Sequence, residues 1–255
     1  MCFVKSYIEI LILMVICQKG GTSMQYVLDT ANIDELKAGF DLYPVEGVTT
    51  NPTIIARENK QFFYTLRHIR EVIGEETMLH VQVLGNTAGK MVKEAHCLHE
   101  LIGGNLYIKV PVFPEGLKAI KQLKIEGVPV TATAILTANQ ALLAAKAGAD
   151  YVAPYVNRID NISGHGVQTV ADIVTMFENF NLPTKVLAAS FKNAQQVHDV
   201  AIAGGHAVTV PYDILKAAVS HPLTDNSLAQ FTSDWERVYG EGCTICELAT
   251  REPMK

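Results

Sequence analysis

The feature that most constrains the fold is a regular alternation of short apolar strands with amphipathic helices, which begins near Met24 and repeats eight times. The strands are short and rich in β-branched residues, as is typical of parallel strands buried on both faces. They are predicted at residues 26–29, 47–50, 80–84, 106–112, 128–134, 151–156, 185–190 and 206–210. Helices are predicted after them, at residues 33–42, 60–72, 88–102, 115–126, 138–147, 167–177, 194–203 and 212–219.

Eight such units within about 215 residues predict an α/β protein, a closed (β/α)8 TIM barrel over residues 24–221. A doubly wound open sheet is the structural alternative. The first strand–helix turn, Asp29-Thr30-Ala31, lacks the glycines of a dinucleotide-binding loop, which argues against it. An additional C-terminal helix is predicted over 225–239, within a segment 222–240, and residues 241–255 form a tail.

Residues 1–23 differ from the rest of the chain, because they contain an isolated apolar run at Ile10–Cys17. We interpret them as a non-native extension ahead of a true start at Met24, since Lys19-Gly20-Gly21 can be encoded by a bacterial ribosome-binding sequence. A secretory signal segment is the alternative interpretation. The absence of an Ala-x-Ala cleavage site from the sequence argues against it.

The composition argues against several classes of function. The chain has 21 basic and 26 acidic side chains and a net charge of -5, whereas nucleic-acid binding needs a basic excess. No apolar run approaches the roughly 20 residues of a membrane span. The five cysteines are too few and too scattered for a disulfide scaffold, which favours a reducing, cytoplasmic location. The Cys243-x-x-Cys246 pair has no second pair, so a zinc or redox role is not favoured.

Lys109 is the most unusual residue of the predicted strands, because it lies within the apolar run Ile108–Val112. A buried lysine that is charged and unpaired is costly, so its pKa usually falls. A neutral amine in a dry site is what Schiff-base chemistry requires. The pattern alone is equally consistent with a structural role for Lys109. Its side chain could reach solvent from a strand end, or it could pair with Asp29 or Glu115.

Other polar side chains fall at the predicted carboxyl ends of strands, where barrels of this kind carry their active sites. Taken singly, each has an ordinary structural interpretation: Asn51 as a turn residue, Thr133 as a β-former and Arg158 as a surface charge. Their convergence on one end of the barrel favours a functional site. The set comprises Asp29, Asn51, Gln82, Thr133, Tyr155, Arg158, Ser190 and Lys192.

Five motifs, spread in order over about residues 24–240, resemble the signatures of the transaldolase family. They are Leu28-Asp29-Thr30, Gly47-Val48-Thr49-Thr50-Asn51-Pro52, Ile108-Lys109-Val110-Pro111, Ala153-Pro154-Tyr155-Val156-Asn157-Arg158-Ile159-Asp160 and Ala188-Ala189-Ser190-Phe191-Lys192. The resemblance implies a (β/α)8 barrel whose Schiff-base lysine is Lys109, on the fourth strand. Gln82 and Tyr155 resemble the fructose-6-phosphate aldolase branch, because transaldolases have a glutamate and a phenylalanine at these places.

The resemblance implies reversible cleavage of fructose 6-phosphate to dihydroxyacetone and glyceraldehyde 3-phosphate through an iminium on Lys109. Tyr155 would remove the C4 hydroxyl proton, with a water held by Gln82 and Thr133. Two alternatives stay open: a transaldolase of the pentose phosphate pathway, and a barrel retained for binding alone. The implied substrate-binding residues are Asp29 and Asn51 for the dihydroxyacetone hydroxyls, and Arg158, Ser190 and Lys192 for the phosphate.

Metal-dependent aldol chemistry is the competing mechanism, and it needs clustered histidines or carboxylates at strand ends. His80, His165 and His206 are dispersed along the sequence, and His80 is expected to be packed inside the barrel. We therefore expect no metal and no cofactor, with small sugar phosphates as the partners. The family resemblance also implies a homo-oligomer, decameric in the aldolase branch, in which the C-terminal helix reaches a neighbouring subunit.

Overall fold

The computed structural model describes residues 23–251. The segment interpreted as a non-native extension or signal lies outside these residues, apart from Ser23. The chain divides into a barrel unit that ends at Ile214 and a C-terminal unit that begins at Leu215. Within residues 23–251, no helix combines the length and the apolar character needed to cross a membrane.

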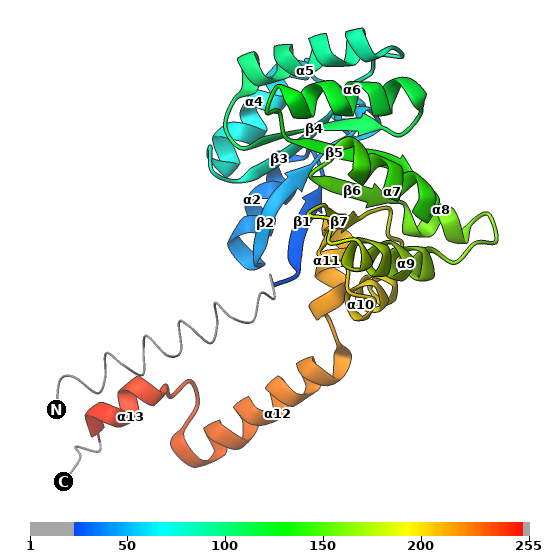
Figure 1. The fold of residues 1–255 in the computed structure, drawn as a ribbon. Helices are drawn as coiled ribbons and strands as arrows, with labels where there is room; N and C mark the ends of the chain where they lie inside the picture. The colour runs from blue at the N-terminus through cyan, green and yellow to red at the C-terminus, as the bar shows by residue number, and fades with distance from the viewer. Residues whose placement is uncertain (1–22, 252–255) are drawn as a thin grey trace, which may run out of the picture. The chain divides into compact units, whose positions relative to one another are not determined.

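Eight parallel strands close into a barrel in the order of the sequence, which confirms the predicted (β/α)8 fold (Figure 1). β1 pairs with both β2 and β8, so the sheet of the barrel has no free edge. The strands are β1 (Gln25–Asp29), β2 (Val45–Thr49), β3 (Met78–Gln82), β4 (Leu106–Pro111), β5 (Val130–Ile135), β6 (Tyr151–Pro154), β7 (Lys185–Ala188) and β8 (Ala207–Val210).

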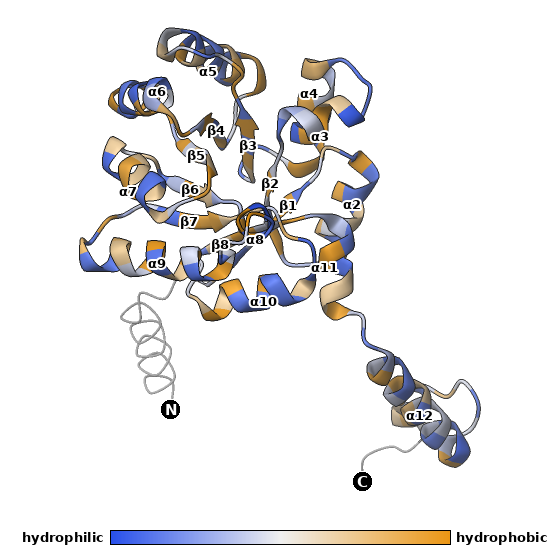
Figure 2. Cartoon of the chain, turned by 90° about the vertical axis from the view of Figure 1, so that its right-hand side faces the viewer, coloured by the Kyte–Doolittle hydropathy of each residue, from blue (hydrophilic) through white to orange (hydrophobic). Residues whose placement is uncertain are grey.

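Helices surround the strands, and hydrophilic and hydrophobic residues alternate along them, as expected of helices that bury one face (Figure 2). The longer ones lie close to their predicted positions. They are α2 (Ile33–Leu42), α4 (Phe62–Ile73), α5 (Ala88–Ile102), α6 (Pro114–Ile125), α7 (Ala138–Ala147), α9 (Gly166–Asn179), α10 (Ala194–Ile202) and α11 (Tyr212–Val219), which crosses the boundary between the two units.

Two short helices, α3 (Pro52–Arg57) and α8 (Val156–Asp160), are absent from the sequence prediction. Both are too short to produce a helical period. The predicted strand over 151–156 is wrong at its end, because β6 stops at Pro154 and Tyr155 is the N-cap of α8. Asn157 and Arg158 therefore lie on a helix at the mouth of the barrel, not at the end of a strand.

The lower part of the barrel interior, toward the amino ends of the strands, is mostly apolar and aromatic. A buried cluster there comprises Val27, Met78, Tyr151, Leu187 and Ala207, with Tyr107 packed against it. His80 stacks on Tyr107 with ring centroids 4.7 Å apart, and its Nδ1 lies 2.8 Å from Thr131 Oγ1. This layer closes the barrel beneath the polar residues at the carboxyl ends of the strands.

The C-terminal unit contains α12 (Pro222–Tyr239), close to the predicted helix, and α13 (Ile245–Arg251) within the predicted tail. α13 begins at a reciprocal cap: Thr244 N–H donates to Glu247 Oε2 at 2.8 Å, and Glu247 N–H donates to Thr244 Oγ1 at 3.3 Å. Among the residues that the structure describes, none of those in α12 is fully buried. The assignment of α12 to contacts between subunits stays a prediction.

Candidate active site

Lys109 lies inside the barrel on β4, and only 5% of the residue is exposed. Its Nζ donates a hydrogen bond to the carbonyl oxygen of Thr50 at 2.8 Å. Burial lowers the pKa of Lys109 below its ordinary value of 10.5, and the nearby Asp29 carboxylate opposes this shift in part. Burial therefore makes the neutral, nucleophilic form of this amine easier to reach than it is in a solvent-exposed lysine.

Asp29 ends β1, and its carboxyl group is near enough to interact electrostatically with that amine. Asp29 Oδ1 accepts a hydrogen bond from Thr49 Oγ1 at 2.6 Å, and Thr49 Oγ1 lies 2.5 Å from Thr209 Oγ1. Burial raises the pKa of Asp29, while the charge of Lys109 and the bond from Thr49 oppose the rise. The chain of hydroxyls holds the carboxyl group in one orientation beside the amine.

Tyr155 and Thr133 form the second pair of the site. Tyr155 Oη lies 3.0 Å from Thr133 Oγ1, and the Arg158 guanidinium carbon lies 4.5 Å from the centroid of the Tyr155 ring. The register of β5 against β6 shifts between Ala132 and Ile135, where Ala134 has a φ of 60°. Such a bulge re-aims the adjacent side chain. The bulge follows Thr133, which shares the inward face of β5 with Thr131 as in a regular strand.

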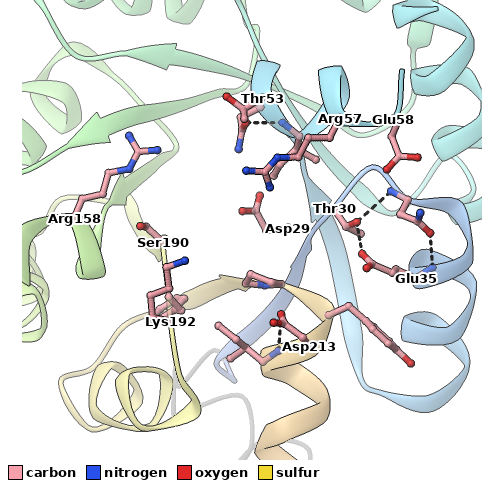
Figure 3. A pocket seen from close by; sticks show the side chains of 17 residues that line it. Asp29, Thr30, Glu35, Thr53, Arg57, Glu58, Arg158, Ser190, Lys192 and Asp213 are labelled. Atoms are coloured by element: carbon pink, nitrogen blue, oxygen red, sulfur yellow. Dashed lines mark hydrogen bonds between the residues drawn. The ribbon is translucent and has the colours of Figure 1, made fainter. Parts of the chain in front are cut away.

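A cavity of about 730 Å³ opens at the carboxyl ends of the strands (Figure 3). All the residues predicted to bind substrate line it: Asp29, Asn51, Arg158, Ser190 and Lys192. In Figure 3, Arg158, Ser190 and Lys192 gather on one side of the cavity, with Asp29 between them and Arg57. The structure thus brings together residues from strand ends and helices that are far apart in the sequence.

Asn51 and Ser190 each have a structural role in addition to their place in this cavity. Asn51 is the N-cap of α3, and its Oδ1 accepts a hydrogen bond from the Ile54 N–H at 3.0 Å. That bond uses only the amide oxygen of Asn51, so the NH₂ group of the same side chain can donate a hydrogen bond to a ligand. Ser190 has a φ of 64°, a left-handed conformation unusual for a residue with a side chain, and such conformations cluster at functional sites.

Gln82 lies apart from the large cavity. It ends β3 in register with Lys109, and it lines two smaller recesses of about 240 and 230 Å³, the second of which it shares with Asn51. Among the described residues, no hydrogen bond joins Gln82 to Thr133 or Tyr155. The shared water expected from the sequence is therefore not prepared by direct contact between these side chains.

The histidines considered for metal binding occupy separate places. His80 contacts Thr131, whereas His206 Nδ1 accepts a hydrogen bond from the Val186 N–H at 3.1 Å. Within the part of the chain that the structure describes, no three histidine, cysteine or acidic residues gather so that they could hold a metal ion. The expectation of a reaction without metal or cofactor stays a prediction.

Two contributors were missed by the sequence analysis. Thr49 donates a hydrogen bond to Asp29, but in the sequence it was noted only as part of the motif Gly47-Val48-Thr49-Thr50-Asn51-Pro52. Arg57 lines the cavity from the end of α3, a helix too short to be recognised. The signal that could have found Arg57 is its spacing of four residues from Thr53, which also lines the cavity.

Comparisons with known proteins agree with this arrangement. Residues 26–245 match the family model described as Transaldolase/Fructose-6-phosphate aldolase. The chain is 43% identical over 213 residues to a "Probable fructose-6-phosphate aldolase" of Streptococcus pneumoniae, covering 83% of this chain and 96% of the relative. It is also 43% identical over 215 residues to a "Probable transaldolase" of Moorella thermoacetica, covering 84% and 99%. A "Probable transaldolase" of Thermoplasma volcanium is 41% identical over 222 residues, covering 86% and 98%.

Proposed function

The chain belongs to the transaldolase/fructose-6-phosphate aldolase family, and on that premise we propose that it is a class I aldolase. Its reaction is the reversible cleavage of fructose 6-phosphate to dihydroxyacetone and glyceraldehyde 3-phosphate. The observation that carries the proposal is the Lys109 amine, which is buried beside Asp29 and has a lowered pKa. A neutral amine is the form that attacks a ketone.

The covalent step begins when Lys109 Nζ attacks C2 of the open-chain ketose. Loss of water from the adduct gives an iminium, which draws electrons from the C3–C4 bond. As that bond breaks, the electron pair forms an enamine, the C4 hydroxyl loses its proton and the aldehyde leaves. Protonation of the enamine at C3 and addition of water then release dihydroxyacetone and restore the amine.

Tyr155 is the group we assign to the C4 hydroxyl proton. Its hydroxyl lies 3.0 Å from Thr133 Oγ1, so the proton has a second hydroxyl within hydrogen-bond reach. Placed proton transfer of this kind typically contributes about 10²–10⁴-fold to a rate. Gln82 supports the assignment indirectly, because an amide cannot take up a proton near neutrality and leaves the acid–base role to the phenol.

Different residues that line the cavity bind the two halves of the substrate. Asp29 and Asn51 hold the hydroxyls of the dihydroxyacetone unit close to Lys109. Arg158, Ser190 and Lys192 hold the phosphate of the aldehyde half, since a guanidinium can donate two parallel hydrogen bonds to a phosphate. Barrels of this architecture frequently bind phosphate near the last strands, where Ser190 and Lys192 lie.

Transaldolase activity is the second candidate, favoured by the names of the Moorella thermoacetica and Thermoplasma volcanium relatives. In that reaction the enamine on Lys109 attacks an aldose phosphate acceptor, so the dihydroxyacetone unit is transferred. The two activities share the Schiff base and differ in what captures the enamine. A proton captures the enamine in the aldolase reaction and an acceptor sugar captures it in the transferase reaction, and water hydrolyses the resulting iminium in both.

The test traps the intermediate first and separates the activities second. Incubation with fructose 6-phosphate and borohydride should add a reduced three-carbon or six-carbon adduct to Lys109, located by mass spectrometry. Absence of an adduct would count against both enzymes. Release of glyceraldehyde 3-phosphate without an acceptor sugar then supports the aldolase, whereas release that requires erythrose 4-phosphate supports the transaldolase.

A further inference from the structure

Arg57 is a third basic residue that lines the 730 Å³ cavity, and the function proposed above gives it no role. It is the last residue of α3, the short helix that follows β2. In Figure 3 its guanidinium extends into the cavity beside Asp29, from the side opposite Arg158 and Lys192. The cavity therefore has basic groups on two facing walls.

Helix geometry fixes the direction in which Arg57 leaves the backbone. Asn51 caps the first turn of α3, and Ile55, 5% exposed, anchors the opposite face of the helix in the core. Thr53 and Arg57 are four residues apart, so they share one face of a helix, and both line the cavity. The side chain is thus held toward the cavity by a capped helix with a buried anchor.

The charge of Arg57 is available to a ligand. The neighbouring Glu58 carboxylate lies 3.9 Å from Lys60 Nζ, and the Glu35 carboxylate accepts a hydrogen bond from Thr30. Among the residues that the structure describes, no carboxylate forms an ion pair with Arg57. A guanidinium that lines a cavity and forms no ion pair with a described residue is suited to an anionic group of the substrate.

We propose that Arg57 determines specificity for phosphorylated substrates, by binding the phosphate from the wall opposite Arg158 and Lys192. This inference rests on the proposed function, which places the reacting carbons at the buried Lys109 amine and so directs the phosphate end of the sugar to the open part of the cavity. A phosphate there lies between basic groups on both sides. The site then discriminates against the same sugar without its phosphate.

The experiment compares Arg57→Ala and Arg57→Lys with the parent protein in the synthetic direction. Dihydroxyacetone is the donor, and the acceptor is either glyceraldehyde 3-phosphate or unphosphorylated glyceraldehyde. Arg57→Ala should lower kcat/KM for the phosphorylated acceptor about 10-fold more than for glyceraldehyde, as expected for a charged hydrogen bond in a partly exposed site. Arg57→Lys should recover part of that preference, because it keeps the charge but loses the fork geometry.

Arg67→Ala is the matched control. Arg67 is an exposed arginine on the neighbouring α4 and does not line the cavity, so its replacement removes the same charge at a different place. An equal loss with both acceptors, no loss in Arg57→Ala, or the same loss in Arg67→Ala would overturn the proposal. The last result would mean that the overall charge, not a contact, attracts the substrate.

A binding measurement separates this proposal from the proposed function. Inorganic phosphate is titrated calorimetrically into the resting protein, the Arg57 variants and Arg67→Ala. Weaker phosphate binding in Arg57→Ala, with intermediate binding in Arg57→Lys and unchanged binding in Arg67→Ala, supports the Arg57 contact even if no aldol turnover is found. Equal binding to all variants, or no binding to the parent protein, overturns it even if the parent protein proves to be an active aldolase.

Discussion

Two layers of the barrel interior contain buried titratable groups, and the layers differ in whether those groups interact with a group of opposite charge. The lower layer, His80, Tyr107 and Tyr151, is neutral: burial lowers the pKa of His80 to about 3 and raises that of Tyr151 to about 12. The upper layer, Lys109 and Asp29, places an amine beside a carboxyl group, and each partly offsets the pKa shift that burial imposes on the other. Burial alone makes polar groups inert, and reactivity comes from pairing them near a cavity.

Replacement of Lys109 by methionine should give the largest difference in kcat between a variant of the upper layer and its control in the lower layer. It removes the nucleophile, so kcat should fall by at least about 10³-fold and borohydride should trap no adduct. The thermal midpoint should change little, because the lower cost of burying a thioether is offset by the loss of the amine beside the buried Asp29 carboxyl group. Lys185→Met, at the edge of the lower layer and 6.0 Å from the Tyr151 ring, is the control that should keep turnover. Turnover by Lys109→Met would contradict the assignment of the nucleophile.

Removal of a single hydroxyl from each layer is the next test. Tyr155→Phe should lower kcat by about 10²–10⁴-fold, because proton transfer at the C4 hydroxyl is lost. The adduct between dihydroxyacetone and Lys109 should still form, since iminium formation does not use Tyr155. Tyr107→Phe is the matched control in the lower layer and should keep kcat within about threefold. Equal kcat values for the two variants would remove Tyr155 from the mechanism.

The lower layer should be the acid-labile part of the molecule. The pKa of His80 falls from 6.5 to about 3 on folding, so the unfolded chain binds more protons between these values. Stability is therefore lost as the pH falls below about 6.5. In His80→Phe the loss between pH 7 and pH 4, measured by urea denaturation, should be smaller by on the order of 3 kcal/mol. His198→Asn changes an exposed histidine and is the control, so its stability should depend on pH as that of the parent protein does. If His80→Phe also lost as much stability as the parent protein between pH 7 and pH 4, His80 would not be the cause of the acid lability.

Two threonine replacements should give the smallest and most diagnostic contrast. Thr49→Val removes the hydrogen bonds to Asp29 and Thr209, and Thr131→Val removes the one to His80. Each lost hydrogen bond should cost about 1–3 kcal/mol of stability. Only Thr49→Val should also move catalysis. Without that bond the pKa of Asp29 rises, its charge supports the Lys109 ammonium less, and the pKa of Lys109 falls.

The measurement for this pair is the pH profile of kcat/KM. Because the neutral amine of Lys109 then persists to lower pH, the acidic limb of Thr49→Val should shift to lower pH by less than about one unit. Thr131→Val should keep the parent profile. A shift of the same size in both variants would mean that the two layers are not electrostatically distinct.

The sequence was sufficient for the barrel, because each strand and long helix carries its own period and the closed order follows from short connections. Lys109 stood out as one charged residue in an apolar strand, but the pattern alone left other interpretations open, and its catalytic role stays a prediction that rests on the family resemblance. The link from Thr49 to Thr209 spans 160 residues and exists only when β1 lies between β2 and β8, so no local pattern reports it. Gln82 was expected from the sequence to share a water with Thr133, but in the structure it lines a separate recess. Its position depends on packing that a strand pattern does not specify.

The short helices α3 and α8 affect how a ligand binds in the cavity. The cavity's two arginines, Arg57 and Arg158, sit on these helices, where flexible loops often serve the same purpose. A ligand therefore meets a preorganised binding surface and does not spend affinity on ordering the backbone around it. Association should accordingly be rapid, with little change in hydrogen-exchange protection at the mouth of the barrel.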